Sequence, residues 1–272
     1  MKFDSKYRQF LPEARRIVVK VGTRVLADKA GRPMRSRIEG IVSQIAFLRR
    51  AGYEVVLVSS GSIGAGMAAL GISKRPEGVP DLQMCAAVGQ ARLIATYEDI
   101  ADAHKLKIGQ MLLTYDDFSS RVRTGNARRT MEHLLRVGIL PIVNENDVVA
   151  DEEVKAFLSL GDNDYLAALV VKLIRADLLV ILSTVDGLMD MTAAHPRRIP
   201  CVEKLDKAAF ALVAPQAKGG LSKGGMDSKL RAASLAVKAG CSVVIADGRK
   251  AGRLADAVAG KDVGTIIPGG TL

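Results

Sequence analysis

Lys20 stands where a positive charge is costly unless an anion lies nearby. It interrupts the apolar run RIVVKV, and Gly22 and Thr23 follow it directly. Burying an unpaired ammonium costs several kcal/mol. We therefore expect Lys20 to end a strand and point at a phosphate, with Gly22 leaving room for the backbone to approach the anion. An edge strand, or a lysine that reaches solvent, would also explain it.

A second lysine, Lys229, ends the glycine-rich and basic segment KGGLSKGGMDSK. The segment leads into a helix, and a lysine in the first turns of a helix opposes the helix dipole unless an anion compensates. We interpret residues 218–229 as a flap that closes over a nucleotide, with Lys229 facing the transferred phosphate. The alternative is a surface loop that carries lysines.

The segment SSGSIGAG at residues 59–66 joins an apolar run to a helical stretch. Its glycines leave backbone donors uncovered beside a helix N-terminus, which is a setting that can hold phosphate. The segment fits neither the Walker pattern nor the nicotinamide-binding fingerprint. A glycine turn that merely caps the helix would look the same.

Two clusters of acids and amides follow, NEND at residues 144–147 and GDND at residues 161–164. Asn146 and Asp147 offer donors and acceptors that suit the carboxylate and the ammonium of an amino acid. Asp162 and Asp164 precede a helix, where an aspartate is also an ordinary N-cap. Because both clusters fall at the expected carboxyl edge of the sheet, we favour a binding site over capping alone.

These residues are positioned by strands that alternate with helices. Helix ends are indicated by Ser36 with Glu39 three residues later and by Gly52. Alternation predicts an α/β protein, a three-layer α/β/α sandwich with a mainly parallel central sheet. Ligands bind such sheets beyond the carboxyl ends of the strands, where every unusual motif lies. The expected strands are 16–21, 54–60, 108–114, 139–143, 178–182 and 242–246, and the clearest helices 126–137, 165–174 and 226–239.

Composition excludes several classes of function. The net charge of +10 comes from scattered residues without interleaved aromatics, which disfavours nucleic acid and leaves a solvated basic surface that attracts anionic substrates. The three cysteines form no CxxC pair and the three histidines show no metal or hydrolase spacing. No signal peptide and no apolar run long enough for a membrane span occur, so we expect a cytoplasmic protein without membrane contact.

Eight motifs, in order, resemble those of the glutamate 5-kinases, which have the amino acid kinase fold. They are IVVKVGT, VVLVSSGSIGAG, AAVGQ, GQMLLT, ILPIVNEND, GDND, VDGL and KGGMDSKLRAA. The resemblance implies ATP-dependent phosphorylation of the side-chain carboxylate of L-glutamate, the first step of proline synthesis, with ATP and Mg²⁺ required. It also implies a homo-oligomer, either a dimer or a tetramer, and feedback inhibition by proline. We expect an N-terminal extension over residues 1–14 and a kinase domain over 15–272, without the RNA-modification-type (PUA) domain of longer relatives.

The resemblance assigns a role to each matching residue. Lys20 and Lys229 would contact the phosphates of ATP, and Asp164 would hold both lysines in position. Ser60, Asp147 and Asn163 would bind glutamate. The nucleotide site would be lined by Lys20, Gly22, Thr23, Ser183, Thr184, Lys223, Gly224, Gly225, Met226, Asp227, Ser228 and Lys229, and no residue is expected to bind a metal directly.

Two departures fall on the nucleotide side. The family usually has Thr-Asp where this chain has Ser183-Thr184, and Gly-Thr-Gly-Gly where it has residues 222–225, SKGG. Other enzymes of the fold remain open, namely kinases that act on acetylglutamate, aspartate, carbamate, uridylate or an isoprenoid phosphate. The basic charge also leaves open a regulator that binds RNA without catalysis. The two amide-rich clusters favour an amino acid as the acceptor.

Overall fold

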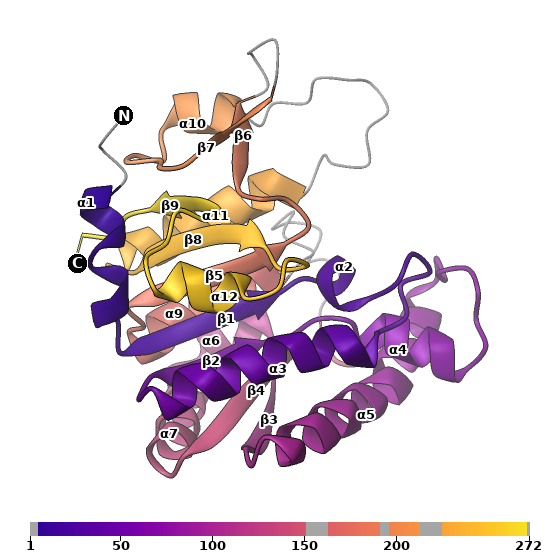
Figure 1. The fold of residues 1–272 in the computed structure, drawn as a ribbon. Coiled ribbons are helices and arrows are strands. Elements are labelled where there is room, and N and C mark those ends of the chain that lie inside the picture. Colours follow the sequence, from indigo (N-terminus) through magenta and orange to yellow (C-terminus); the bar gives the residue numbers. More distant parts are fainter. Residues whose placement is uncertain (1–4, 151–162, 191–195, 213–224, 271–272) are drawn as a thin grey trace.

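A seven-stranded sheet forms the centre of the molecule, in the order β3-β4-β2-β1-β5-β8-β9. The structure is a computed structural model that describes residues 5–150, 163–190, 196–212 and 225–270. All neighbouring strands run parallel except the last pair, β8 and β9. The predicted three-layer α/β/α architecture is therefore confirmed, and Figure 1 shows helices on both sides of the sheet.

The strands are short and almost wholly apolar, as expected for a parallel sheet covered on both faces. Arginine, glutamate or serine occurs mainly at strand ends, where the chain enters or leaves the core. The strands of the main sheet are β1 (Arg16–Val21), β2 (Glu54–Val58), β3 (Lys107–Leu113), β4 (Ile139–Glu145), β5 (Leu178–Ser183), β8 (Ser242–Asp247) and β9 (Thr265–Ile267), and β6 (Leu188–Asp190) pairs with β7 (Arg197–Ile199) in a separate hairpin.

Alternate residues of each strand face two different cores. One core holds Val19 of β1 and is covered by α3 (Arg35–Arg50), α5 (Val79–Ala103) and α12 (Arg253–Val258). The other holds Val18 of β1 and is covered by α7 (Arg121–Arg136), α9 (Asn163–Ile174) and α11 (Gly225–Lys238). The remaining helices are short: α1 (Ser5–Arg8), the 3₁₀ turn η1 (Leu11–Glu13), α2 (Thr23–Leu26), α4 (Ser62–Ala69), α6 (Tyr115–Ser119) and α10 (Lys207–Ala211).

Several details differ from the sequence-based expectation. Helix α3 begins at Arg35 with Met34 as its N-cap, so the capping box predicted at Ser36 is wrong. The predicted end is right, because Gly52 follows the helix with a φ of +94° that other residues rarely adopt. The hairpin of β6 and β7 and the antiparallel strand β9 were not predicted, because each of these strands has only three residues and is too short to show a recognisable sequence pattern. Cys85 and Cys241 are buried, whereas Cys201 is half-buried.

Helices α4 and α5 pack unusually closely through glycines, and this fixes the loop after β2. A Cβ atom on Gly89 of α5 would lie 1.8 Å from the Ser62 carbonyl oxygen at the start of α4. A Cβ atom on Gly66 of α4 would lie 1.8 Å from the Cys85 carbonyl oxygen. Only glycine permits this approach, so the start of α4, and with it the end of β2, is held against the long helix α5.

Candidate active site

One buried carboxylate holds the two predicted lysines together. Asp164 lies in the first turn of α9, and its Oδ1 is 2.7 Å from Lys20 Nζ on β1. Its Oδ2 is 2.9 Å from Lys229 Nζ on α11. Lys20 and Asp164 are fully buried and Lys229 is 6% exposed. Three residues that are far apart in the sequence thus form one cluster at the carboxyl end of β1.

The strand pattern explains why these side chains meet. Lys20 shares the face of β1 on which Val18 packs, and that face is covered by α9 and α11. The two helices pack against each other. Their N-terminal turns therefore deliver Asp164 and Lys229 to the same end of the sheet that Lys20 reaches.

The two lysines hold the Asp164 carboxyl in its ionised form. Burial raises the pKa of the Asp164 carboxyl, but the two ammonium groups lower it further than burial raises it, so its pKa lies below the ordinary value. Asp164 is therefore ionised at neutral pH and pairs with both ammonium groups. Two ammonium groups brought together in a largely dry site are placed to contact an anionic ligand.

Further contacts fix Lys229 and Asp164. Lys229 Nζ also donates to the Gly225 carbonyl oxygen at 3.0 Å, which bends the lysine back along its own helix. Ser228 Oγ donates to Asp164 Oδ2 at 3.2 Å. The hydroxyl of Ser228 therefore orients the carboxylate, although the residue was expected in the lining of the nucleotide site.

The other residues predicted on the nucleotide side occupy strand and helix ends. Gly22 donates its backbone N–H to the Leu182 carbonyl, and a Cβ there would lie 3.6 Å from Lys20 Nζ. Thr23 begins α2, and half-buried Ser183 ends β5 just before Thr184.

The predicted flap is described only from Gly225 onward. Met226 is half-buried against the α9–α11 core. The Asp227 carboxylate pairs with Arg231 of the same helix at 2.7 Å, so this side chain is engaged away from the cluster. Lys223 and Gly224 lie outside the described residues, as do Gly161 and Asp162.

A chain of hydrogen-bonded amide side chains lies on the side of β1 where β2 and β4 are. Asn163 Nδ2 donates to Ser60 Oγ at 3.0 Å and to Asn144 Oδ1 at 2.7 Å, and it also contacts the Ser59 carbonyl oxygen. An NH₂ group has two hydrogens, so it can satisfy only two of these three acceptors at once. Asn144 Nδ2 in turn donates to Gln90 Oε1 of α5 at 2.8 Å. Asn163 and Ser60 are thereby held beside Asp164, which follows Asn163 in the chain.

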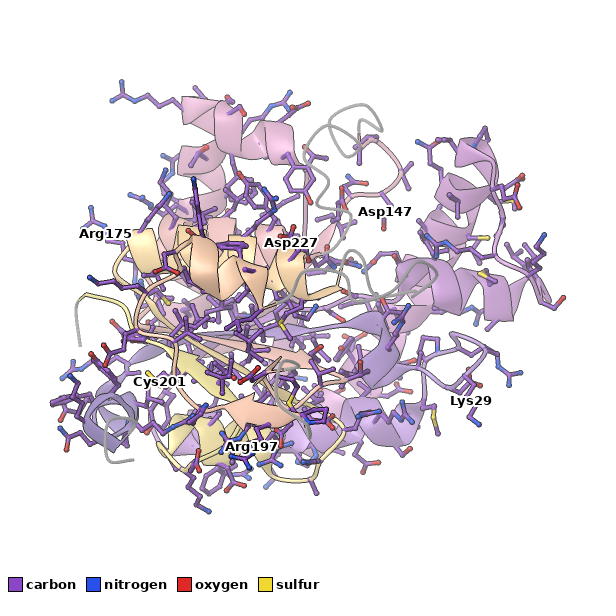
Figure 2. The ribbon with its side chains drawn as sticks, turned by 90° about the horizontal axis from the view of Figure 1, so that it is seen from above. Lys29, Asp147, Arg175, Arg197, Cys201 and Asp227 are labelled. Carbon is purple, nitrogen blue, oxygen red and sulfur yellow. The ribbon has the colours of Figure 1, made fainter. Side chains whose placement is uncertain are left out.

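Asp147 belongs to the same side of the site. Its Oδ2 accepts a hydrogen bond of 3.0 Å from Ser62 Oγ at the start of α4. Figure 2 labels Asp147 in the loop after β4 and Asp227 on α11. Polar groups from the end of β4, the loops after β2 and β4, and the first turns of α4 and α9 thus lie on this side of the site.

Gln90 and Asn144 were not singled out from the sequence. Gln90 ends the motif AAVGQ and Asn144 begins NEND, so both motifs contained the signal. Their roles depend on a contact between α5 and β4, which no local pattern reveals.

The order of strands separates two regions of the edge. Strands β2 and β4, with Ser60 and Asn144, lie on one side of β1, while β5 and β8 lie on the other. Lys20 and Lys229 stand at the boundary between them. This arrangement can hold two ligands that meet at the cluster.

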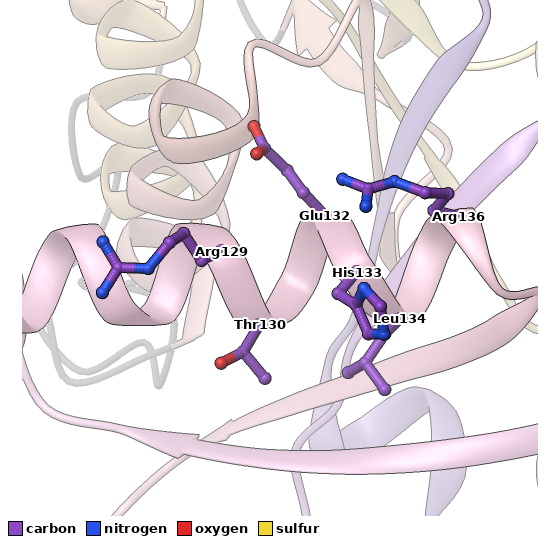
Figure 3. Close-up of a pocket in the computed structure, with 6 residues that line it drawn as sticks. All are labelled: Arg129, Thr130, Glu132, His133, Leu134 and Arg136. Atoms are coloured by element: carbon purple, nitrogen blue, oxygen red, sulfur yellow. The ribbon is translucent and has the colours of Figure 1, made fainter.

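A hollow elsewhere on the surface does not compete with this site. Its lining comes from α7 alone, and Figure 3 shows that Glu132 and Arg136 point to one side of the helix whereas Thr130, His133 and Leu134 point to the other. Side chains that point in different directions in this way do not form a binding site. The hollow is lined by Arg129, Thr130, Glu132, His133, Leu134 and Arg136.

Within the described ranges, no group of three or more histidine, cysteine, aspartate or glutamate side chains is arranged to hold a metal ion. Both oxygens of Asp164 already face ammonium groups. None of the described helices has the length and apolar character that crossing a lipid bilayer requires.

Comparison with known proteins gives the family. The model of the amino acid kinase family matches residues 15–247. The chain belongs to the amino acid kinase family. The "Glutamate 5-kinase" of Streptomyces coelicolor is 45% identical over 262 residues, which are 96% of this chain and 68% of that protein. The "Glutamate 5-kinase" of Clostridium tetani is 42% identical over 271 residues, covering 97% of this chain and 98% of the relative.

Solved structures show the same fold. A carbamate kinase from Giardia lamblia bound to AMP-PNP matches with a TM-score of 0.63 and 19% identity, covering 95% of this chain and 99% of that one. At this identity the likeness supports the amino acid kinase fold alone.

The lysine cluster yields a prediction about stability. We expect Asp164→Asn to lower the free energy of unfolding by about 3–5 kcal/mol at neutral pH, because two buried ammonium groups would lose their counter-charge. Urea denaturation measures this loss. Asp227→Asn is the matched control, since that carboxylate pairs with Arg231 at an exposed position and should cost no more than about 1 kcal/mol. Equal stability of the two variants would contradict the buried cluster.

Proposed function

We propose that this chain is a glutamate 5-kinase. It transfers the γ-phosphoryl group of MgATP to the side-chain carboxylate of L-glutamate and forms γ-glutamyl phosphate, in the first step of proline biosynthesis. The observation that carries the proposal is that Lys20 and Lys229 both pair with Asp164. These lysines lie between the amide-lined region near β2 and β4 and the ends of β5 and β8. The curated relatives of the same family support the choice of acceptor.

The reaction needs charge compensation rather than a catalytic base. A glutamate side chain has a pKa of about 4.3 in water, so at neutral pH it is already a nucleophile. The barrier comes from repulsion between this carboxylate and the γ-phosphate, and from the need to align them. Lys20 and Lys229 supply positive charge to the phosphoryl group as it transfers, and Asp164 keeps the two ammonium groups in place.

Glutamate is held on the side of β2 and β4. Ser60 and Asn163 present a hydroxyl and an amide within hydrogen-bond distance of each other. The Asn163 NH₂ group faces more acceptors than it has hydrogens, so bound glutamate would supply a hydrogen-bond partner to an acceptor that Asn163 leaves unsatisfied. The carboxylate of Asp147 is the partner for the substrate's ammonium group. The nucleotide lies on the side of β5 and β8, near Gly22, Ser183 and Thr184.

Magnesium enters with the nucleotide. Mg²⁺ keeps several water ligands and commonly binds through nucleotide phosphates, so a dedicated set of protein carboxylates is not required. The described residues fit this arrangement, because the one carboxylate in the cluster is committed to the lysines. When bound with the nucleotide, the ion would neutralise part of the triphosphate charge, and Lys20 and Lys229 would act on the transferred phosphoryl group.

Four further properties belong to the proposal through the resemblance to glutamate 5-kinases. The kinase domain comprises residues 15–272 and follows a short N-terminal extension. The protein acts in the cytoplasm as a homo-oligomer, and proline inhibits it. Sedimentation velocity and a proline titration of the activity test the last two.

The activity is tested by trapping its product. Purified protein with MgATP, L-glutamate and hydroxylamine should form γ-glutamyl hydroxamate, because hydroxylamine captures the labile acyl phosphate. Parallel reactions with acetylglutamate, aspartate and carbamate should give far less ATP consumption. ATP hydrolysis that does not depend on glutamate, or preference for another acceptor, would overturn the assignment.

The role of Lys20 gives a sharper test. We expect Lys20→Ala to lower turnover by about two to three powers of ten, since a charge aimed at the transition state is lost, with little change in the KM for glutamate. The hydroxamate assay measures both constants, and thermal unfolding verifies that the variant is folded at the assay temperature. Lys107→Ala removes an exposed lysine on the edge strand β3 and should behave like the wild type. A mild effect of Lys20→Ala on turnover would argue against the role.

A further inference from the structure

An arginine and an aspartate at the end of β8 form a second charged pair near the lysine cluster. Asp247 is the last residue of β8, and Arg249 folds back over it. Arg249 Nε lies 2.9 Å from Asp247 Oδ1, and Nη2 lies 2.8 Å from Oδ2. The backbone N–H of Arg249 also donates to Oδ1 at 3.0 Å. This bidentate geometry holds the guanidinium in a single orientation.

The pair faces the same layer as the lysines. Strands β1, β5 and β8 are neighbours, and Ser183 of β5 is in register with Asp247. Val18 of β1, Ile181 of β5 and Ile245 of β8 all belong to the α9–α11 core. Side chains alternate along a strand, so Lys20, Ser183 and Asp247, each two residues further along, also face that layer.

The turn after β8 is pressed against the turn after β1. A Cβ on Gly248 would lie 2.8 Å from Leu182 Cβ and 2.9 Å from Val25 Cγ1 of α2. The Leu182 carbonyl also accepts the backbone N–H of Gly22. Gly248 donates its own N–H to the Ser183 carbonyl at 2.9 Å. Arg249 is thus fixed at the edge where the nucleotide side of the site begins, and Figure 1 shows α2 beyond the edge of the sheet toward which β8 points.

The guanidinium of Arg249 is the part of this pair that a ligand can reach. The Asp247 side chain is only 7% exposed, whereas that of Arg249 is 48% exposed. Arg249 Nη2 also donates to the Thr184 carbonyl at 2.7 Å. Within the described part of the chain, Nη1 has no recorded acceptor. The Arg249 guanidinium lowers the pKa of Asp247, which keeps the carboxylate ionised and the arginine anchored.

We propose that Arg249, positioned by Asp247, binds the nucleoside end of the nucleotide by donating from Nη1. This proposal takes the direction in which ATP lies from the proposed function. With the γ-phosphoryl group at Lys20 on β1, β8 is two strand spacings away, or roughly 10 Å. That distance places Arg249 beyond the transferred group and toward the ribose and base. Arg249 and Asp247 are additions to the residues predicted from the sequence.

Binding of two nucleotide fragments to the free protein tests this assignment. Isothermal titration calorimetry with MgADP and with magnesium tripolyphosphate separates the nucleoside from the phosphates. We expect Arg249→Ala to weaken ADP about 10-fold, because a hydrogen bond from a charged donor is lost, and to leave tripolyphosphate within about 2-fold of the wild type. Arg249→Lys keeps the charge but loses the planar fork, so it should resemble Arg249→Ala.

Two more variants complete the design. Asp247→Asn should weaken ADP by several-fold without affecting tripolyphosphate, because the arginine loses its anchor but not its donors. Lys250→Ala is the control, since this neighbouring cation pairs with Asp186 and should leave both ligands unchanged. Thermal unfolding of each variant separates a local change in binding from a loss of structure.

The outcomes distinguish the two proposals. Unchanged ADP affinity in folded Arg249→Ala or Arg249→Lys would overturn the role of Arg249, and so would equal weakening of ADP and tripolyphosphate. Because binding is measured without turnover, the result stands even if glutamate proves not to be the acceptor. A wild-type protein that binds neither ligand would instead overturn the nucleotide site as a whole.

Discussion

The structure depends on the contact of two buried ammonium groups with one buried carboxylate. Removing these charges from water costs free energy that a single ion pair barely recovers. Asp164 pairs with both ammonium groups and so brings two positive charges to one point at the edge of the sheet. In the proposed function, this pair of charges stabilises the γ-phosphoryl group as it is transferred. The cluster is largely buried, where an interaction between opposite charges is strong.

The rest of the fold provides the rigidity that this contact needs. Lys20 comes from the central strand β1, which is paired on both sides, and Asp164 and Lys229 come from helices that pack on each other. The glycine contacts between α4 and α5 hold the end of β2 in place, and the chain from Gln90 to Asn163 holds the amides. Lys20, Asp164 and Lys229 are thus each carried by a helix or strand, which limits the motion of their side chains.

Much of this arrangement was predictable from the sequence because its signals are local. A lysine in an apolar strand and a lysine at the start of a helix are each in conflict with their surroundings, and such conflicts mark functional residues. The alternation of strands and helices gave the layers and the edge at which the motifs meet. The family resemblance added the expectation that Asp164 links the two lysines, which no spacing could supply.

What escaped prediction depends on contacts between distant segments. Gln90 bonds Asn144 only because α5 meets β4, and Arg249 bonds the Thr184 carbonyl only because β8 lies beside β5. The hydroxyl of Ser228 bonds Asp164, a contact between α11 and α9 that no local pattern indicates. The helix start at Arg35 was missed since a serine followed by a glutamate is common and does not compel a cap.

The central claim is tested most directly by a crystal structure with L-glutamate, Mg²⁺ and a non-hydrolysable ATP analogue. The account predicts that Nζ of Lys20 and Nζ of Lys229 each lie about 2.7–3.2 Å from oxygens of the γ-phosphoryl group. The glutamate side-chain carboxylate should approach that group from the side of Ser60 and Asn163. A γ-phosphoryl group on the opposite face of the sheet, or one bonded by neither lysine, would contradict it.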